Sequence, residues 1–328
     1  MAKYVAKRLI YIIFVLLLGS MLLFLIYQMI PGDPALQMIA GNETDFTAEE
    51  WAIEYARARE LLGLDYPLYV RYFRWISNMA VGEFGFSMMF RRPVIDVIRA
   101  PMLNTVILNI LTMFFVFSIT IPLGIAAAVR RGKAFDQGIQ VFTSIGLSIP
   151  NFVIALILIW IFPITLGIFN IGGMATPNFQ GTTWEFILDR AYFMALPVGT
   201  LVIASLAGLT RFVRASMAEA LTMDYVRTAR SKGLLEKAVV YSHAFRNSLI
   251  PLITVMTGWL ISVFGGSVIV ESMFSWNGMG NIMLQGLLQF DFALVQTMQL
   301  FFFLVSLVGL LLMDLAYGLA DPRVRVSE

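Results

Sequence analysis

The chain has 328 residues, of which 59% are hydrophobic and only 13% are charged. Soluble domains carry about a quarter charged residues, so this composition excludes a water-soluble protein and indicates one whose solvent is the lipid bilayer. The 23 basic and 21 acidic residues nearly balance, which disfavours a nucleic-acid-binding protein, and the lack of cysteine excludes disulfides and thiolate chemistry.

Six apolar stretches come close to or exceed the roughly 20 residues that a helix needs to cross ~30 Å of hydrocarbon. We expect spanning helices at residues 9–30, 106–129, 139–161, 196–213, 249–270 and 293–319. The first stretch follows basic residues as a signal peptide does, but its length and the lack of a small-residue cleavage site favour a retained helix. The sequence therefore predicts an all-α membrane protein with six transmembrane helices.

The distribution of basic residues predicts the orientation, because Lys and Arg accumulate in short loops on the cytoplasmic side. Six spans place both ends on one side, and that side holds fifteen basic residues against six acidic ones. The long segment 31–100 on the other side has seven basic against ten acidic residues. We expect both termini to be cytoplasmic.

Segment 31–100 contains helix signals of its own. Thr47 and Glu50 have the spacing of a capping box, apolar residues follow at helical intervals, and Gly63 is a helix stop. Pro67 can begin a second helix. The pattern predicts an external amphipathic helical segment, which is either a lid packed on the helix ends or a docking platform for an external partner.

Ionisable residues that would carry chemistry inside the membrane are scarce. We expect Asp314, Glu271 and Asp291 to be interfacial carboxylates at helix ends, and the single histidine, His243, to be a surface or helix-capping residue. Facing acids, a base near a nucleophile and a P-loop are all missing from the sequence. This disfavours an ion-driven carrier and an enzyme, so the energy source is expected in another subunit and no cofactor is expected in this chain.

The loop 214–248 is unusual because it places 35 residues of mixed charge between two membrane helices. Its pattern predicts a helix, a break at Gly233 and a second helix. An amphipathic helix in a basic loop either lies on anionic headgroups or inserts into a groove of a soluble partner, and the pattern alone gives these equal weight.

Residues 224–234 (DYVRTARSKGL) and 243–251 (HAFRNSLIP) in and after this loop resemble the EAA loop of bacterial ABC importer permeases, in the dipeptide, oligopeptide and nickel subfamily. The resemblance to the B-type subunit extends along nearly the whole chain. It is carried by residues 31–34, 62–65, Pro67, Arg71, Tyr72, Trp75, Gly82, Gly85, Ser87 and 321–323.

Three positions depart from the general pattern. Arg227 stands where the general motif has glutamate, and Pro251 comes later after Gly233 than in sugar importers; both look typical of the peptide branch. Asn277 stands where the family is expected to have proline, which predicts a looser external turn.

The resemblance implies a type I ABC importer permease fold with an external helical insertion after the first helix. It implies an N-terminal helix at 1–30, the external segment at 31–100 and a five-helix core at 101–328 with the coupling loop at 214–248. It also implies that part of this loop lies in a cleft of a cytoplasmic ATPase. The residues of this coupling region are Arg227, Ala229, Arg230, Lys232, Gly233, Leu234, Leu235, Glu236 and Lys237.

A peptide pathway should be wet and weakly polar, which makes small polar residues of the fifth helix candidates for the pore lining. These are Thr254, Thr257, Ser262 and Ser267, although such residues also hold membrane helices together. Pro150, Gly258, Gly265 and Gly266 are bend or close-packing candidates on the same reasoning.

The function implied is the pore-forming subunit of an ATP-driven importer of di- or oligopeptides in a bacterial or archaeal cytoplasmic membrane. The implied partners are a second permease, homologous or identical, two cytoplasmic subunits that bind ATP and Mg²⁺, an extracytoplasmic substrate-binding protein and membrane lipid, with no nucleic acid. Nickel or oligosaccharide cargo is the alternative within transport. A membrane-bound enzyme and a scaffold are distant alternatives.

Overall fold

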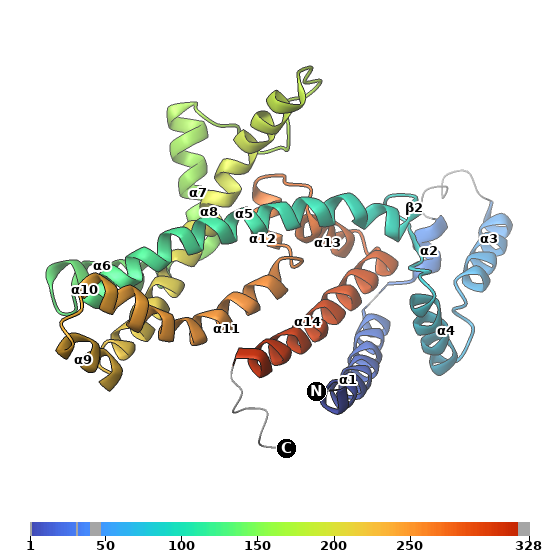
Figure 1. Ribbon diagram of the computed structural model, residues 1–328. Coiled ribbons are helices and arrows are strands. Elements are labelled where there is room, and N and C mark those ends of the chain that lie inside the picture. Colours follow the sequence, from blue (N-terminus) through green and yellow to red (C-terminus); the bar gives the residue numbers. More distant parts are fainter. Residues whose placement is uncertain (1, 31, 40–46, 321–328) are drawn as a thin grey trace. The chain divides into compact units, whose positions relative to one another are not determined.

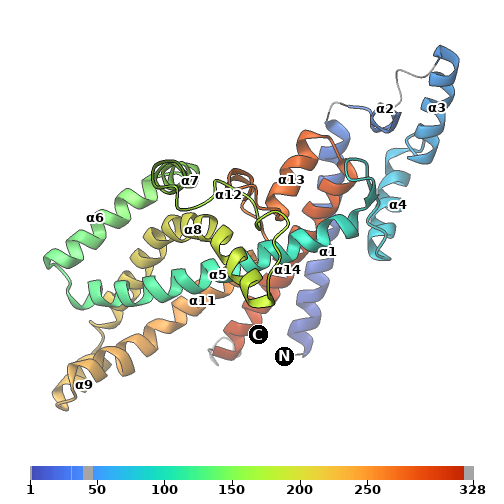
Figure 2. The ribbon, with the colours of Figure 1, turned by 90° about the horizontal axis from the view of Figure 1, so that it is seen from above.

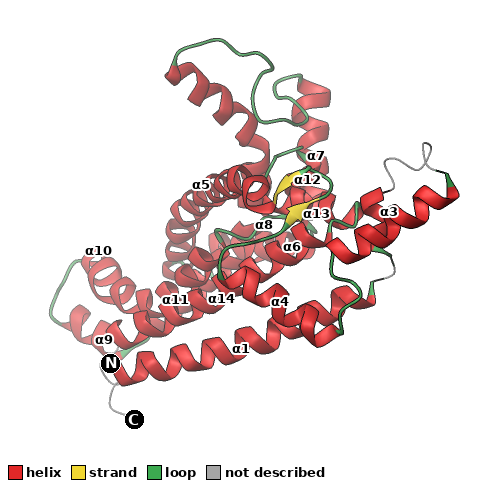
Figure 3. Ribbon diagram, turned by 90° about the vertical axis from the view of Figure 1, so that its right-hand side faces the viewer, coloured by secondary structure: helices red, strands yellow, loops and turns green. Residues whose placement is uncertain are grey.

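The computed structural model describes residues 2–30, 32–39 and 47–320, which are almost entirely helical with one short hairpin (Figures 1 and 3). The family-like residues at 31 and 321–323 lie outside the described part. Contacts divide the chain into two compact units, Met1–Met102 with Ile282–Val308, and Leu103–Asn281 with Gly309–Glu328.

Four helices are long and apolar enough to cross a bilayer without a break. They are α1 (Ala2–Met29), α5 (Val94–Val129), α8 (Thr183–Ala220) and α14 (Phe292–Ala320). Two bent pairs of segments have the same character when each pair is counted as one span: Ala134–Ser148 with Asn151–Leu166, and Glu236–Leu249 with Pro251–Ser262. Counted in this way, the described residues contain up to six candidate spans, the number expected, and two of them are broken.

The third span bends by 97° between α6 (Ala134–Ser148) and α7 (Asn151–Ile159), as Figure 1 shows. Pro150 lies at the bend, where it lacks the N–H that would continue the helix, so the expected bend at this residue is confirmed. The span then continues as a π-helix, η2 (Trp160–Leu166), around Pro163.

The fifth span is shorter than the expected 249–270. Helix α11 (Arg246–Ser262) ends before a break that contains Gly265 and Gly266, and α12 (Val268–Met273) begins beyond it. Two consecutive glycines do not sustain a helix, because each loses more backbone entropy on folding than any other residue.

In the first unit, the external segment forms α2 (Pro34–Ile39), α3 (Ala48–Leu61) and α4 (Leu68–Ala80). The capping box of Thr47 and Glu50 is present, and Gly63 ends the helical run with a φ of +64°. Pro67 immediately precedes α4. Trp51, Tyr55, Leu62 and Leu64 cover a small buried cluster formed by Ala35, Ile39 and Ala58.

A two-residue hairpin, β1 (Phe86–Ser87) paired antiparallel with β2 (Arg92–Pro93), precedes α5. Asp291, just before α14, is 3% exposed and accepts hydrogen bonds from the Ser87 hydroxyl and the Met89 N–H. Asp291 therefore lies at the end of a helix as expected, but it is buried and not open to water or headgroups. The carboxylate instead ties the hairpin to the start of α14.

The second unit has its core where α5, α8 and α11 meet, around Leu108, Val213, Met217 and Leu252. Helix α6 packs along α8 (Figure 2). Four short elements complete the described helices: α9 (Asp224–Ser231), α10 (Glu236–Ala238), the π-helix η3 (Val239–Phe245) and α13 (Met279–Leu288). Val226 and Val239 attach α9 and η3 to this core.

Gly266 is required by close packing. A Cβ added there would overlap the backbone of Gly280. We expect Gly266→Ala to lower the stability of the chain by about 1–3 kcal/mol, the usual cost of overpacking. Gly138→Ala in α6 is the matched control, because a Cβ at Gly138 has no atom within 4 Å and is expected to leave stability unchanged or raised by up to about 1 kcal/mol. Thermal unfolding in detergent measures both. Equal effects of the two variants would contradict the packing explanation.

Candidate coupling surface and translocation path

The coupling region begins with α9, which lies at one end of the second unit (Figure 2). Val226 and Ala229, one helical turn apart, are 0% and 4% exposed and pack into the core of that unit. Ala229 therefore anchors α9. The other face carries exposed charge, including Arg227, whose guanidinium lies 3.5 Å from the Asp224 carboxylate.

The turn after α9 follows from Gly233. Its φ is +74°, a left-handed conformation that side-chain-bearing residues rarely adopt, and its N–H donates to the Arg230 carbonyl at 2.9 Å. The chain reverses here and presents Leu234 and Leu235 to solvent, 43% and 81% exposed. The stop expected at Gly233 is confirmed, although the preceding helix is interrupted once more, between Ala220 and Asp224.

An ion pair braces this turn. Arg230 donates to the Glu236 carboxylate through Nη2 at 2.6 Å and through Nε at 3.1 Å. The hydrogen bond to Glu236 raises the pKa of Arg230 above its ordinary value. Lys232 and Lys237 flank the pair and are exposed. Residues 230–237, all of which are exposed, form the coupling tip.

A buried ion pair lies in the same unit and was not singled out from the sequence. Asp136, at the start of α6, is 1% exposed and binds both Nε and Nη2 of Arg214 on α8. The Gly132 N–H and the Gln140 amide also donate to Asp136. The only sequence signal was an acid beside a basic cluster, which is equally typical of a solvated loop.

The four pore candidates are not on one helix. Thr254, Thr257 and Ser262 lie on α11, whereas Ser267 directly precedes α12 beyond the break. Thr254 and Thr257 share the face of α11 opposite Leu252, which is buried in the core. Beside the break is a small pocket of about 90 Å³, and its polar lining consists of Asn109, Thr112, Ser205 and Ser262.

A buried polar network fixes the segment between α11 and α13. Glu271 is 0% exposed and accepts from the Thr105 hydroxyl at 2.9 Å and from the Asn281 N–H at 3.1 Å. Glu271 was expected to be open to water or headgroups, and its burial contradicts that expectation. Burial raises the pKa of this carboxyl, although hydrogen bonds from Thr105 and nearby backbone N–H groups oppose the shift.

The turn at Asn277 is held by side chains of two helices. The Asn104 amide donates to the Asn277 carbonyl at 2.7 Å, and Arg190 donates to the same Asn104 side chain at 2.6 Å. The Arg190 guanidinium also lies over the ring of Trp276, 5.7 Å from its centroid. That asparagine in place of proline loosens this turn stays a prediction, because the carbonyl that Asn104 holds is one that proline would also offer.

These features define a multi-pass helical membrane protein with a helical loop that exposes an apolar turn between charged residues. The chain belongs to the family of binding-protein-dependent transport system inner membrane components, whose model matches residues 120–326, and an N-terminal model of the same kind of component matches residues 1–95. It is therefore the inner-membrane component of a transport system that depends on a binding protein.

The similarity to individual relatives extends along nearly the whole chain. It is 36% identical over 325 residues to the oligopeptide transport system permease protein AppB of Bacillus subtilis and, over the same length, to the glutathione transport system permease protein GsiC of Escherichia coli. In both cases 99% of each chain is covered. Among solved structures, an inward-facing form of the MetNI methionine ABC transporter overlaps 66% of this chain and 95% of its own, at 17% identity and a TM-score of 0.49.

Proposed function

We propose that this chain is the pore-forming subunit of an ATP-driven importer of di- or oligopeptides. It receives cargo from an extracytoplasmic substrate-binding protein and is moved by two cytoplasmic ATPase subunits. The peptide assignment is supported by relatives named for oligopeptide and for glutathione transport, since glutathione is itself a small peptide.

The observation that most directly supports a mechanism driven by an ATPase is the exposed apolar turn of the coupling tip. Leu235 is 81% exposed at the end of a turn fixed by Gly233 and by the Arg230–Glu236 pair. An apolar side chain presented in this way favours a binding groove on a partner, and its ring of charges favours a partner with complementary charge. We infer that the ATPase supplies this groove.

Force would pass from the tip into the membrane through helices that move as rigid bodies. Val226 and Val239, which flank the tip on α9 and η3, are both fully buried in the core of the second unit. Displacement of the tip therefore displaces this core, because close-packed interiors transmit strain. The chain itself needs no catalytic residue for this role.

The remaining assignments follow from this role. Both termini and the coupling loop 214–248 would be cytoplasmic, and segment 31–100 would face the binding protein. A second permease, homologous or identical, would complete the pore. Thr254, Thr257 and Ser262 on α11 and Ser267 before α12 would contribute weakly polar groups to the path.

The cargo is tested with the reconstituted complex of both permeases, the ATPases and the binding protein. We expect ATP hydrolysis to rise at least severalfold when the binding protein is loaded with a di- or oligopeptide, because only the loaded protein favours the transporting state. Nickel ions and an oligosaccharide serve as comparison ligands. Stimulation by one of these ligands and by no peptide would contradict the peptide assignment and leave the coupling mechanism intact.

A further inference from the structure

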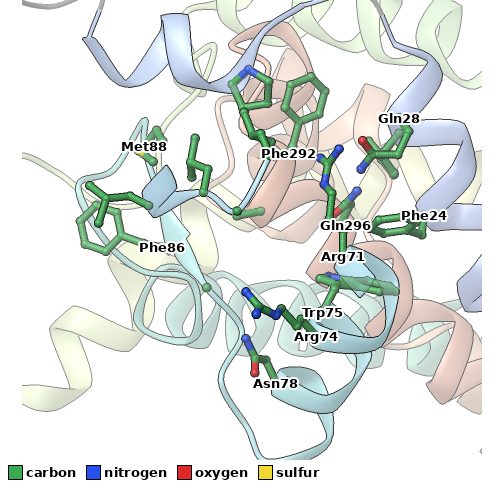
Figure 4. A pocket seen from close by; sticks show the side chains of 18 of the residues that line it. Phe24, Gln28, Arg71, Arg74, Trp75, Asn78, Phe86, Met88, Phe292 and Gln296 are labelled. Carbon is green, nitrogen blue, oxygen red and sulfur yellow. The ribbon is translucent and has the colours of Figure 1, made fainter. Parts of the chain in front are cut away.

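The first unit contains a pocket of about 900 Å³, shown in Figure 4. It is lined by the last turns of α1, by residues 32–34, by the end of α3 and the turn after it, by α4, by the residues before and within β1, and by the start of α14. This pocket has no part in the coupling mechanism described above. Its volume and its mixed lining are those of a ligand site, since such sites usually measure about 300–1,000 Å³ and combine apolar walls with a few polar groups.

Two arginines of α4 bring positive charge to the pocket. Arg71 is half-buried and points into it beside Gln28 and Gln296 (Figure 4). Among the residues that the structure describes, no carboxylate or hydrogen-bond acceptor is paired with its guanidinium. Arg74 follows on the same face of α4 and lies 3.8 Å from the centroid of the Tyr66 ring.

Among the described residues, none of the acids that line the pocket forms an ion pair with Arg71 or Arg74. Asp291 is engaged by Ser87 and by backbone N–H groups, and Asp33 accepts from the Tyr55 hydroxyl and the Ala35 N–H. Glu60 and Glu83 are exposed, as Arg74 is, so water screens these three charges and leaves Arg71 as the least screened charge on α4. Burial, together with the nearby charge of Arg59, lowers the pKa of Arg71, which means that its charged state is held there at a cost that a bound anion would offset.

Much of the remaining lining is aromatic, and it joins the ends of two candidate spans. Phe24 packs against Trp75, with ring centroids 5.8 Å apart, and Tyr27 packs against Phe292 at 6.2 Å. These contacts join the end of span α1 to α4 and to the beginning of span α14. The pocket lies at the ends of the candidate spans Ala6–Met29 and Phe292–Asp314, and its aromatic residues are of the kind that gather at the level of the lipid headgroups, where lipid is the most abundant anionic ligand.

We propose that this pocket binds the headgroup of an anionic phospholipid, with the phosphate on Arg71 and Arg74 and the glycerol and upper acyl chains against Phe24 and Trp75. The guanidinium suits this ligand because its planar set of N–H donors matches phosphate oxygens in a two-point contact. A bound lipid would brace α4 against α1.

The test uses the full-length chain with its partner subunits in nanodiscs made of equal parts phosphatidylglycerol and phosphatidylcholine. Native mass spectrometry then counts the lipids that stay on the complex after the disc is removed. We expect the wild-type complex to retain phosphatidylglycerol in preference to phosphatidylcholine, and Arg71→Gln to weaken that retention about tenfold or more. Arg57→Gln is the matched control, since the Arg57 side chain is 69% exposed on α3 and does not line the pocket.

Two further measurements keep the outcome unambiguous. Thermal unfolding without added lipid should show Arg71→Gln to be no less stable than wild type, because the substitution removes an unpaired, half-buried charge. Competition on the wild-type complex uses inorganic phosphate and trialanine, which represent a soluble anion and a peptide carboxylate. The proposal is overturned if wild type shows no preference for phosphatidylglycerol, if Arg57→Gln loses as much lipid as Arg71→Gln, or if either soluble ligand displaces the lipid at millimolar concentration.

Discussion

Replacing Arg214 by alanine is expected to lower the free energy of unfolding by about 3–5 kcal/mol, the largest effect expected of any single substitution considered for this chain. The reason is the burial of its partner. Asp136 is 1% exposed, and Arg214 is the only cation paired with it among the described residues. Without the guanidinium, the carboxylate stays buried with hydrogen bonds from neutral groups alone, which do not offset the loss of its hydration.

Arg211→Ala provides the control on the same helix. Arg211 lies on an exposed part of α8 and donates one hydrogen bond, to the Ser144 hydroxyl at 2.8 Å, so its loss should change stability by no more than about 0.5 kcal/mol. Replacing Asp136 and Arg214 together by leucine should recover most of the lost stability, since no charge is then left buried. Denaturant unfolding in detergent micelles measures all three. Similar losses for Arg211→Ala and Arg214→Ala would show that burial of the pair is not the cause.

Glu236→Arg is expected to reduce cargo uptake by tenfold or more while ATP hydrolysis continues. The substitution replaces the ion pair that braces the coupling tip with repulsion between residues 230 and 236, so the turn that carries Leu235 is no longer held in one conformation. Folding should be unaffected, because exposed pairs of this kind contribute about 0–1 kcal/mol to stability. Uptake and hydrolysis are measured side by side in proteoliposomes that contain the complete complex.

The charge-swapped double variant, Arg230→Glu with Glu236→Arg, tests whether coupling needs only an ion pair across the turn or needs arginine at position 230 and glutamate at position 236. It restores an ion pair across the same turn and should recover a substantial part of the coupled uptake. Normal uptake by Glu236→Arg alone would contradict the role of the coupling tip in transmitting force. A swap that stays as defective as the single variant would mean that the ATPase contacts these two side chains directly.

Local signals in the sequence predicted local structure correctly. Thr47 with Glu50, Gly63, Pro150 and Gly233 each act through backbone geometry within a few residues, so their effects can be read without knowledge of the fold. The apolar runs predicted the spans for a similar reason, because the bilayer imposes a length on each helix independently of its neighbours.

Pairings between distant residues were not predictable in this way. Glu271 and its partner Thr105 are 166 residues apart, and Asp291 and Ser87 are 204 apart, so carboxylates that look interfacial in the sequence become buried and satisfied in the fold. The turn at Asn277 shows the same limitation, because Asn104, which holds the Asn277 carbonyl, lies 173 residues away in the sequence.

The pocket of the first unit that contains Arg71 was not predicted from the sequence either, for a related reason. Arg71 and Trp75 were visible as family-like residues, but their position against the end of α1 and the start of α14 depends on how α4 packs in the first unit. Amphipathic spacing predicts that α4 is a helix and has an apolar face, and it contains no information about which spans that face covers.

The central claim is that the chain is a passive gate driven through its coupling tip by a motor in other subunits. Uptake of a radiolabelled peptide into proteoliposomes, with the binding protein outside and ATP inside, tests it most directly when the complete complex is compared with one that lacks the ATPase subunits. The account predicts uptake only with the ATPases present and hydrolysing ATP. Peptide accumulation by the permeases alone, at a comparable rate, would contradict it.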